Sequence, residues 1–414
     1  MSTVAHPLPA TLVQAKAISI VASAAVMFGV FLSGFVINEP APYELFMAGL
    51  IAVWALFGLR LSRHAALLLT IFVTYNVGGL LSMSTMGDLY ETPLYLAVTL
   101  FLALSAVFFV AILEADHTRY KLIFIGWTTA AVLTGMLGIA GYFRLFPGAE
   151  LFTRYDRAMG AFGDPNVFGP YLALPGVYML YRLLTGNPLK MPLYVVVFTI
   201  IVAAIFFSFS RGAWGLFGAA SIMLTMALFL QSNSGLFRLR VALMSALAIT
   251  LLIVAIVVLL QLPGVGEFFA MRARLVQDYD GGEMGRFARF GIGLQMALEN
   301  PLGIGPLNFG RLLGEDTHNI WLKALMDYGW TGFAAFVTLV LWTIAGGFRI
   351  LFRDRPWQPY LLCAYVVFLG HLVLGTVIDM DHWRHFYLLI GLIWGAMALE
   401  ARYQRGFLRT SARA

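Results

Sequence analysis

Five arginines and one histidine lie in a long charged segment of an otherwise apolar chain, between residues 263 and 318. The segment also carries seven acidic residues, and it ends at His318 just before another apolar run. Guanidinium groups bind phosphate oxygens through paired hydrogen bonds, and a neutral imidazole can accept a proton. These residue types favour the handling of an anionic, lipid-borne substrate at a membrane surface. The arginines are Arg272, Arg274, Arg286, Arg289 and Arg311.

Two of these arginines lie on a segment with helical periodicity. Apolar residues recur every three or four positions across residues 285–299, which predicts an amphipathic helix on the membrane surface. Arg286 and Arg289 are three positions apart and therefore project in neighbouring directions; an ordinary solvated helix face would give the same pattern. After this helix, Gly303 and Gly305 allow a tight, closely approaching backbone on the way to His318.

His318 is predicted to stand at the N-terminal edge of a span, next to Asn319. A helix N-terminus disfavours a charged imidazole and so keeps it able to accept a proton. Asp316 acts in the opposite direction, and the sequence does not decide between the two effects. A capping or interface histidine would occupy the same position.

Ser210-Arg211-Gly212 lies between two apolar runs with almost no loop. Ser210 can cap the following helix, whose free N–H groups favour an anion, and Arg211 adds donors suited to phosphate. Because charge at membrane depth is costly, a functional Arg211 competes about equally with an interfacial arginine paired to lipid headgroups or to a carboxylate.

A second polar segment, residues 144–165, contains Arg154 and Arg157. It ends in Gly163-Asp164-Pro165-Asn166, a turn that is expected to start the next helix. Arg154, Arg157 and Asp164 are therefore candidates for contacts to a substrate, as is Asn319 beside the histidine.

A group of histidines and aspartates near the C-terminus could suggest a metal site. Its spacing fits no standard metal site, and a polar turn between two spans explains it equally well. The sequence therefore predicts neither a metal ion nor another cofactor. The residues are His371, Asp379, Asp381, His382 and His385.

The elements that must position these residues are membrane spans. The chain has 414 residues, of which 60% are hydrophobic and only 12% are charged, about half the charged fraction of soluble domains. Apolar stretches near the length of a bilayer-crossing helix recur about twelve times. We expect an all-α polytopic membrane protein with a single domain, 1–414, and a long loop at 263–318. The stretches are 12–37, 43–60, 65–82, 92–113, 121–143, 166–184, 191–209, 211–230, 240–262, 319–350, 358–379 and 384–402.

Charge distribution predicts the orientation of these spans. Most basic residues fall in the alternate loops that would be cytoplasmic if the N-terminus is cytoplasmic, as the positive-inside bias requires. Both termini are then cytoplasmic and the 263–318 loop lies outside. The same bias accounts for the net charge of +6, so nucleic acid is not an expected partner. The first apolar run should remain as a span, and the single cysteine, Cys363, excludes a disulfide framework.

The order of these motifs resembles the O-antigen ligase and polysaccharide polymerase family of membrane proteins. The resemblance covers residues 160–350 and rests on S-R-G at a helix start, G-R-F-x-x-F before E-N-P-L-G-I-G, then T-H-N-I-W-L and D-Y-G-W-T-G-F. The family's loop arginine opens an R-x-x-x-W pattern, in which Arg286 takes the arginine's place and Phe290 the tryptophan's. Asp164-Pro165-Asn166 and Trp383-Arg384-His385-Phe386 look like the exopolysaccharide-related branch.

This resemblance implies a metal-independent, inverting glycosyl transfer at the periplasmic face of the bacterial inner membrane. The donor would be a glycan on undecaprenyl diphosphate, and the other partners an acceptor glycan and membrane lipids. Arg211 and Arg286 would hold the diphosphate as it leaves, and His318 would take the proton from the acceptor hydroxyl. Arg289 is the alternative loop arginine.

Three alternatives stay open. The acceptor is either lipid A-core, as in a ligase, or another lipid-linked repeat unit, as in a polymerase. A transporter or flippase has a similar span count, but transporters place ionisable residues at mid-membrane, and here the polar residues gather on one face. A structural or assembly subunit would leave Arg211 and the long loop unexplained.

Overall fold

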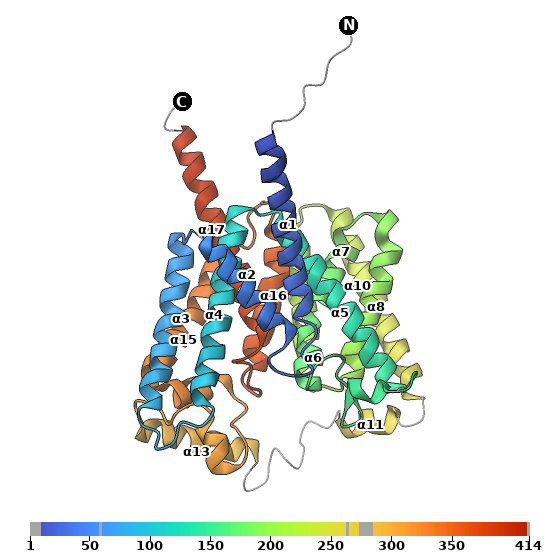
Figure 1. Ribbon diagram of the computed structural model, residues 1–414. Helices are drawn as coiled ribbons and strands as arrows, with labels where there is room; N and C mark the ends of the chain where they lie inside the picture. Colours follow the sequence, from blue (N-terminus) through green and yellow to red (C-terminus); the bar gives the residue numbers. More distant parts are fainter. Residues whose placement is uncertain (1–9, 58–59, 262–264, 273–284, 412–414) are drawn as a thin grey trace.

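The computed structural model describes residues 10–57, 60–261, 265–272 and 285–411, so Arg274 and much of the charged stretch before Arg286 lie outside the described residues. Its long helices stand side by side in one bundle (Figure 1). The helices of the first half are α1 (Ala10–Leu32), α2 (Pro42–Leu56), α3 (Arg63–Met83), α4 (Thr92–Ala115), α5 (Arg119–Tyr142), α6 (Pro165–Tyr171), α7 (Ala173–Thr185) and α8 (Met191–Phe207). The second half adds α9 (Arg211–Gln231), α10 (Gly235–Leu260), α11 (Val265–Arg272), α13 (Arg286–Glu299), α14 (Asn308–Leu313), α15 (Ile320–Ile350), α16 (Gln358–Leu374) and α17 (Arg384–Ser411).

Elements other than α-helices are few in the described part of the chain. Two short 3₁₀ helices, Ala149–Phe152 and Pro188–Lys190, accompany a small antiparallel hairpin of β1 (Thr153–Arg154) and β2 (Arg157–Ala158). The sequence did not predict this hairpin. The prediction of an all-α architecture therefore holds except for four residues of strand.

Eight helices in the described part are long and apolar enough to cross a membrane, judged by length and composition. Three shorter apolar helices, Lys16–Leu32, Pro42–Leu56 and Gln358–Leu374, correspond to further predicted stretches. The predicted stretch 166–184 forms two helices, α6 and α7, which meet at Leu172. Twelve full spans are thus not confirmed, although each predicted stretch contains a helix in its described part.

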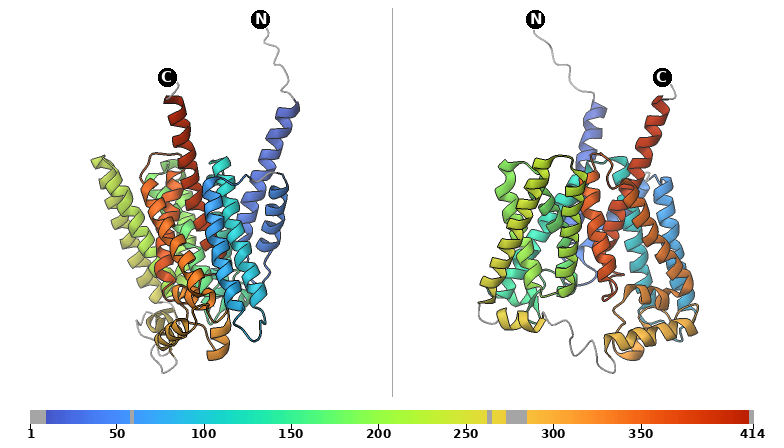
Figure 2. Two further views of the ribbon diagram at one scale, coloured as in Figure 1. Left: turned by 90° about the vertical axis from the view of Figure 1, so that its left-hand side faces the viewer. Right: turned by 180° about the vertical axis from the view of Figure 1, so that it is seen from behind.

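The two ends of the bundle differ. The start of α1 and the end of α17 project from one end, which we call the terminal end (Figures 1 and 2). Helices α11 and α13 lie across the opposite end, which we call the loop end (Figure 1). The predicted placement of both termini on one side and the long loop on the other is consistent with this arrangement. Which side faces the cytoplasm stays a prediction.

Helix α15 is interrupted at Gly329, and this break attaches the loop end to the bundle. Gly329 has φ 62° and ψ −174°, a region open almost only to glycine. The break frees backbone groups, and the Trp330 amide donates to the Pro301 carbonyl (3.0 Å) while the Ile304 amide donates to the Met326 carbonyl (2.8 Å). Gly303, with φ 93°, lets this segment approach, as the sequence predicted.

Helix α13 confirms the predicted helix at 285–299, but its two arginines do not share one environment. Phe287, Leu294 and Leu298 are exposed, so the apolar stripe faces away from the protein. Arg289 is buried, together with Gly293 and Ala297 on the opposite face. The exposed apolar stripe fits a helix lying on a membrane surface.

Close packing varies strongly among the long helices. Helix α15 packs along α3, α17 along α4, and α16 along α9. Helix α10, by contrast, buries only Val241 of its 26 residues and leans away from the bundle (Figure 2).

We predict that Gly329→Ala destabilises the protein. A Cβ at this position would lie 2.5 Å from the Leu302 carbonyl oxygen, and the backbone conformation alone costs a non-glycine residue about 1–3 kcal/mol. Thermal unfolding in detergent measures the loss. Gly218→Ala in α9 is the matched control, because no atom lies within 4 Å of its added Cβ. Equal melting temperatures for the two variants would contradict this account of the break.

Candidate active site

His318 lies at the loop end, immediately before α15. Its backbone is left-handed, with φ 53°, which turns the chain into the helix. The imidazole lies between two carboxylates, with Nδ1 3.2 Å from Oδ2 of Asp379 and Nε2 3.2 Å from Oε1 of Glu315. The side chain is about one-third exposed, so a substrate hydroxyl can reach the ring.

Two carboxylates beside the ring affect the pKa of His318. The hydrogen bond to Asp379, aided by Glu315, raises the pKa of His318 above its ordinary value despite partial burial. The acids responsible are Asp379 and Glu315, and Asp316 instead pairs with Lys323 at 2.9 Å.

Asn319 has a capping function in this structure. Its side-chain oxygen accepts hydrogen bonds from the amides of Trp321 (3.0 Å) and Leu322 (3.1 Å), as an N-cap residue does. It therefore fixes the start of α15 beside His318. Its predicted contact to substrate stays a prediction.

Arg289 joins α13 to the segment that carries His318. Its Nη1 donates to the Asp316 carbonyl at 3.0 Å, and its Nη2 lies 2.5 Å from Oε2 of Glu315. Arg286 is one turn earlier, at the first position of α13, and is only half-buried. The two arginines that the sequence could not separate are thus distinguished by burial.

Arg211 is the first residue of α9, and Ser210 caps that helix by accepting from the Ala213 amide (3.4 Å). The predicted cap is confirmed. Arg211 is half-buried. Its neighbour Gly212 packs so closely on α16 that an added Cβ would lie 2.4 Å from Cδ1 of Leu374.

The end of α16 connects Arg211 with His318. Leu374, which Gly212 contacts, is the last residue of α16, and the next carbonyl, that of Gly375, accepts a hydrogen bond from the Ile320 amide at 2.8 Å. Ile320 is two residues beyond His318. The structure therefore brings Arg211 and His318 to the same helix end from different parts of the chain.

Arg157 is buried and fastens the 144–165 segment beside Arg211. Its Nε donates to the Ser208 carbonyl (2.8 Å), and its Nη2 donates to Oδ1 of Asn166 (2.7 Å). Asp164 caps α6 by accepting from the Asn166 amide at 2.6 Å, which confirms the predicted helix start. Arg154 is exposed and donates to the Gly163 carbonyl at 2.9 Å.

Sequence reasoning missed a buried ionic cluster behind His318. Lys323 is 4% exposed, and its Nζ lies 2.9 Å from Asp316 and 3.8 Å from Asp327. Nearby, the Tyr95 hydroxyl bonds to Asp381. A lysine and an aspartate four positions apart at the start of an apolar run were the available signal, but nothing in the sequence identifies Tyr95 or Asp381 as neighbours.

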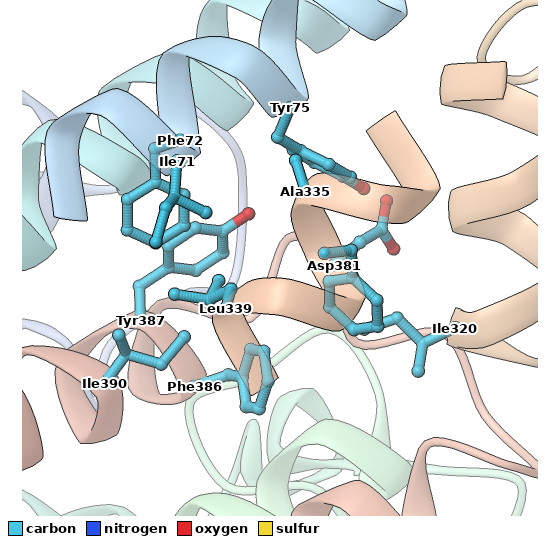
Figure 3. A pocket seen from close by; sticks show the side chains of 11 residues that line it. Ile71, Phe72, Tyr75, Ile320, Ala335, Leu339, Asp381, Phe386, Tyr387 and Ile390 are labelled. Carbon is cyan, nitrogen blue, oxygen red and sulfur yellow. The ribbon is translucent and has the colours of Figure 1, made fainter. Parts of the chain in front are cut away.

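Two pockets are too small or too distant to be the site. A cavity lined by Tyr75, Tyr387 and Asp381 lies between α3, α15 and α17 (Figure 3). Its volume of about 10 Å³ is at the lower limit for one water molecule, so no sugar fits. A pocket of about 510 Å³ is lined by residues of the terminal end, among them Trp357 and Arg402, and includes none of the predicted site residues.

The histidines near the C-terminus contact aromatic rings and a hydroxyl group. His371 and His385 are both buried, with ring centroids 5.2 Å apart, and Nε2 of His382 lies 2.9 Å from Oγ1 of Thr99. Among the described residues, no group of three or more His, Cys, Asp or Glu side chains could hold a metal ion. Metal-free chemistry stays a prediction for experiment.

Comparison with known proteins bears on this geometry. No curated protein matches the chain. Residues 195–337 match the family model described as O-antigen ligase, a segment that runs from α8 into α15 and contains Arg211, Arg286, Arg289 and His318. This match supports an O-antigen ligase-like family for the chain, and it covers about a third of its length.

Proposed function

We propose that this protein is an inverting, metal-independent glycosyltransferase of the O-antigen ligase type. It moves a glycan from undecaprenyl diphosphate to a hydroxyl of lipid A-core at the periplasmic face of the inner membrane. The observation that supports the proposal is that the neighbours of His318 and Arg211 both contact the end of α16: the Ile320 amide bonds to the Gly375 carbonyl, and Gly212 packs on Leu374. A proton acceptor and a phosphate-binding cation are the two groups that this transfer needs.

In the proposed reaction, Nε2 of His318 takes the proton of the acceptor hydroxyl while Nδ1–H donates to Asp379. Glu315, which faces Nε2 at 3.2 Å, is largely exposed and swings aside when the acceptor enters. The acceptor oxygen forms a bond to the anomeric carbon from the side opposite the diphosphate. The bond from that carbon to the phosphate oxygen breaks, and its electron pair leaves on the diphosphate.

Arg211 and Arg286 hold the leaving diphosphate in this proposal. Both are half-buried at the first position of a helix, where the helix N-terminus also favours negative charge. Arg289, Arg157, Asn319 and Asp164 act mainly by positioning, because each bonds to neighbouring backbone or side chains. Arg154 stays a candidate for direct contact, since its side chain is exposed.

A polymerase that joins lipid-linked repeat units would use the same groups, with a different acceptor. The two functions are separated by a deletion strain analysed on gels. Truncated lipopolysaccharide with intact secreted polymer supports the ligase, and the reverse pattern supports the polymerase. Unchanged lipopolysaccharide and polymer, with impaired export of a lipid-linked glycan, would support transport instead.

We expect purified protein to transfer glycan from a lipid-linked donor to lipid A-core in the presence of a chelator. Arginines rather than a divalent cation neutralise the diphosphate in the proposed site. The measurement is product formation with and without chelator. Activity that disappears on chelation and returns with added magnesium would contradict the metal-free mechanism.

We predict that His318→Ala lowers the transfer rate about 10²- to 10⁴-fold, as loss of a general base does, while donor binding persists. The wild-type kcat/KM should rise with pH through the pKa of His318, because only the neutral ring accepts a proton. Asp379 raises that pKa, so Asp379→Asn should shift the acid limb of the profile to lower pH. An acid limb that does not move would remove Asp379 from this role.

The two loop arginines should respond differently to alanine. Arg286→Ala is expected to lower kcat/KM about 10- to 100-fold through lost charge-assisted hydrogen bonds, with little change in melting temperature. Arg289→Ala should lower the melting temperature, since it removes the contacts to Glu315 and the Asp316 carbonyl. The opposite assignment of the two effects would make Arg289 the substrate-binding residue.

A further inference from the structure

Two exposed tyrosines at the loop end share an unusual construction. Tyr90 has φ 42° and is 61% exposed, and Tyr155 has φ 53° and is 64% exposed. Each ring faces a guanidinium group, that of Arg311 at 3.4 Å from the Tyr90 centroid and that of Arg154 at 5.0 Å from the Tyr155 centroid. We call these the Tyr90–Arg311 and Tyr155–Arg154 pairs.

The backbone at both tyrosines is one that bulky residues rarely adopt. Tyr155 and Asp156 form the two-residue turn of the β1–β2 hairpin, both with φ 53°. Turns of this kind favour asparagine, aspartate and glycine at these positions. An exposed tyrosine with such a backbone is a reason to look for a function at that position.

The Tyr155–Arg154 pair is fixed close to the proposed phosphate site. Arg154 donates to the Gly163 carbonyl, and Arg157, across the hairpin, donates to the Ser208 carbonyl. Ser208 is three residues before Arg211. The hairpin that carries the Tyr155 ring is therefore attached to the chain three residues before Arg211, which is proposed to bind the donor's diphosphate.

The Tyr90–Arg311 pair is fixed on the His318 side. Arg311 belongs to α14, and a Cβ at the adjacent Gly310 would lie 3.4 Å from the carboxyl carbon of Asp316, two residues before His318. Near Tyr90, the Thr92 hydroxyl donates to the Pro306 carbonyl at 3.1 Å. This hydrogen bond attaches the loop that carries Tyr90 to the segment that precedes α14. At the loop end, the α3–α4 loop lies on the side of α13, and the hairpin lies on the side of α11 (Figure 1).

We propose that the two pairs are stacking platforms for sugars, Tyr155 for the donor glycan and Tyr90 for the acceptor glycan. This inference rests on the proposed glycosyl transfer. The face of an aromatic ring is electron-rich, and a pyranose presents C–H bonds to it from one face. The guanidinium fixes the ring from its other side and offers N–H donors to sugar hydroxyls.

A tyrosine at this end of a membrane protein could also be an interfacial anchor. An anchor needs an amphipathic ring, but it needs neither a left-handed backbone nor a guanidinium on the ring face. Leucine at the same position would retain an apolar side chain for lipid while removing the aromatic face. Phenylalanine would retain the face.

The experiment measures KM of the purified full-length protein for donor lipids extracted from a strain lacking this protein and separated by glycan length. Tyr155→Leu should raise KM about 3- to 10-fold for long glycans and leave KM unchanged for the shortest, while Tyr155→Phe behaves as wild type. Tyr90→Leu should raise KM for the acceptor and leave the donor KM unchanged. Tyr403→Leu is the matched control, since Tyr403 faces Arg355 at 4.0 Å on α17 at the terminal end.

The Tyr155→Asn variant controls for the possibility that a raised KM reflects loss of folding. Asparagine suits the turn, so this variant should melt no lower than wild type and still show the raised donor KM. A KM increase that is independent of glycan length, or equal behaviour of leucine and phenylalanine, would overturn the platforms. A wild-type protein that transfers no glycan would instead overturn the proposed function.

Discussion

Helix ends inside a bilayer leave backbone N–H and C=O groups without partners, and hydrocarbon offers them none. The arrangement of the loop end follows from how this protein pairs those groups. The amide at the start of α15 bonds to the carbonyl just beyond α16, and the break at Gly329 pairs with Pro301 and Ile304. Charged loops are thus attached to the spans through backbone hydrogen bonds, which do not depend on side-chain rotamers. This attachment fixes the position of His318, two residues before Ile320.

Local signals made the helices and their starts predictable. Apolar length identified the spans, and periodicity identified α13 almost to the residue. The sequence predicts Ser210 as an N-cap and Asp164 as part of a turn that starts a helix, and each side chain accepts from the helix that follows it. Asn319 caps α15 in the same way, although the sequence indicates it only as a substrate contact. These features depend on residues within four positions of one another, which a sequence displays directly.

Long-range pairing was not predictable in the same way. Asp379 reaches His318 from 61 residues away, and no spacing rule selects it over the other acids. The burial of Arg289 likewise depends on which face of α13 meets the 315–317 segment, and the sequence shows only that two arginines share a helix. The β1–β2 hairpin escaped notice because its turn carries Tyr155 rather than a typical turn residue. Tertiary packing decided each of these points.

Helix α10 has a consequence for how the membrane acts on the molecule. Its apolar part begins after Arg240, and residues 241–260 span about 30 Å, which matches the hydrocarbon thickness of about 30 Å. Few protein contacts oppose a change in its tilt, because Val241 is its one buried residue. Helix α11, which contacts α10, places Phe268 and Phe269 against Phe209 and Trp214 on either side of Arg211. A change in the tilt of α10 is therefore expected to alter the packing at the corner of the protein where Arg211 lies.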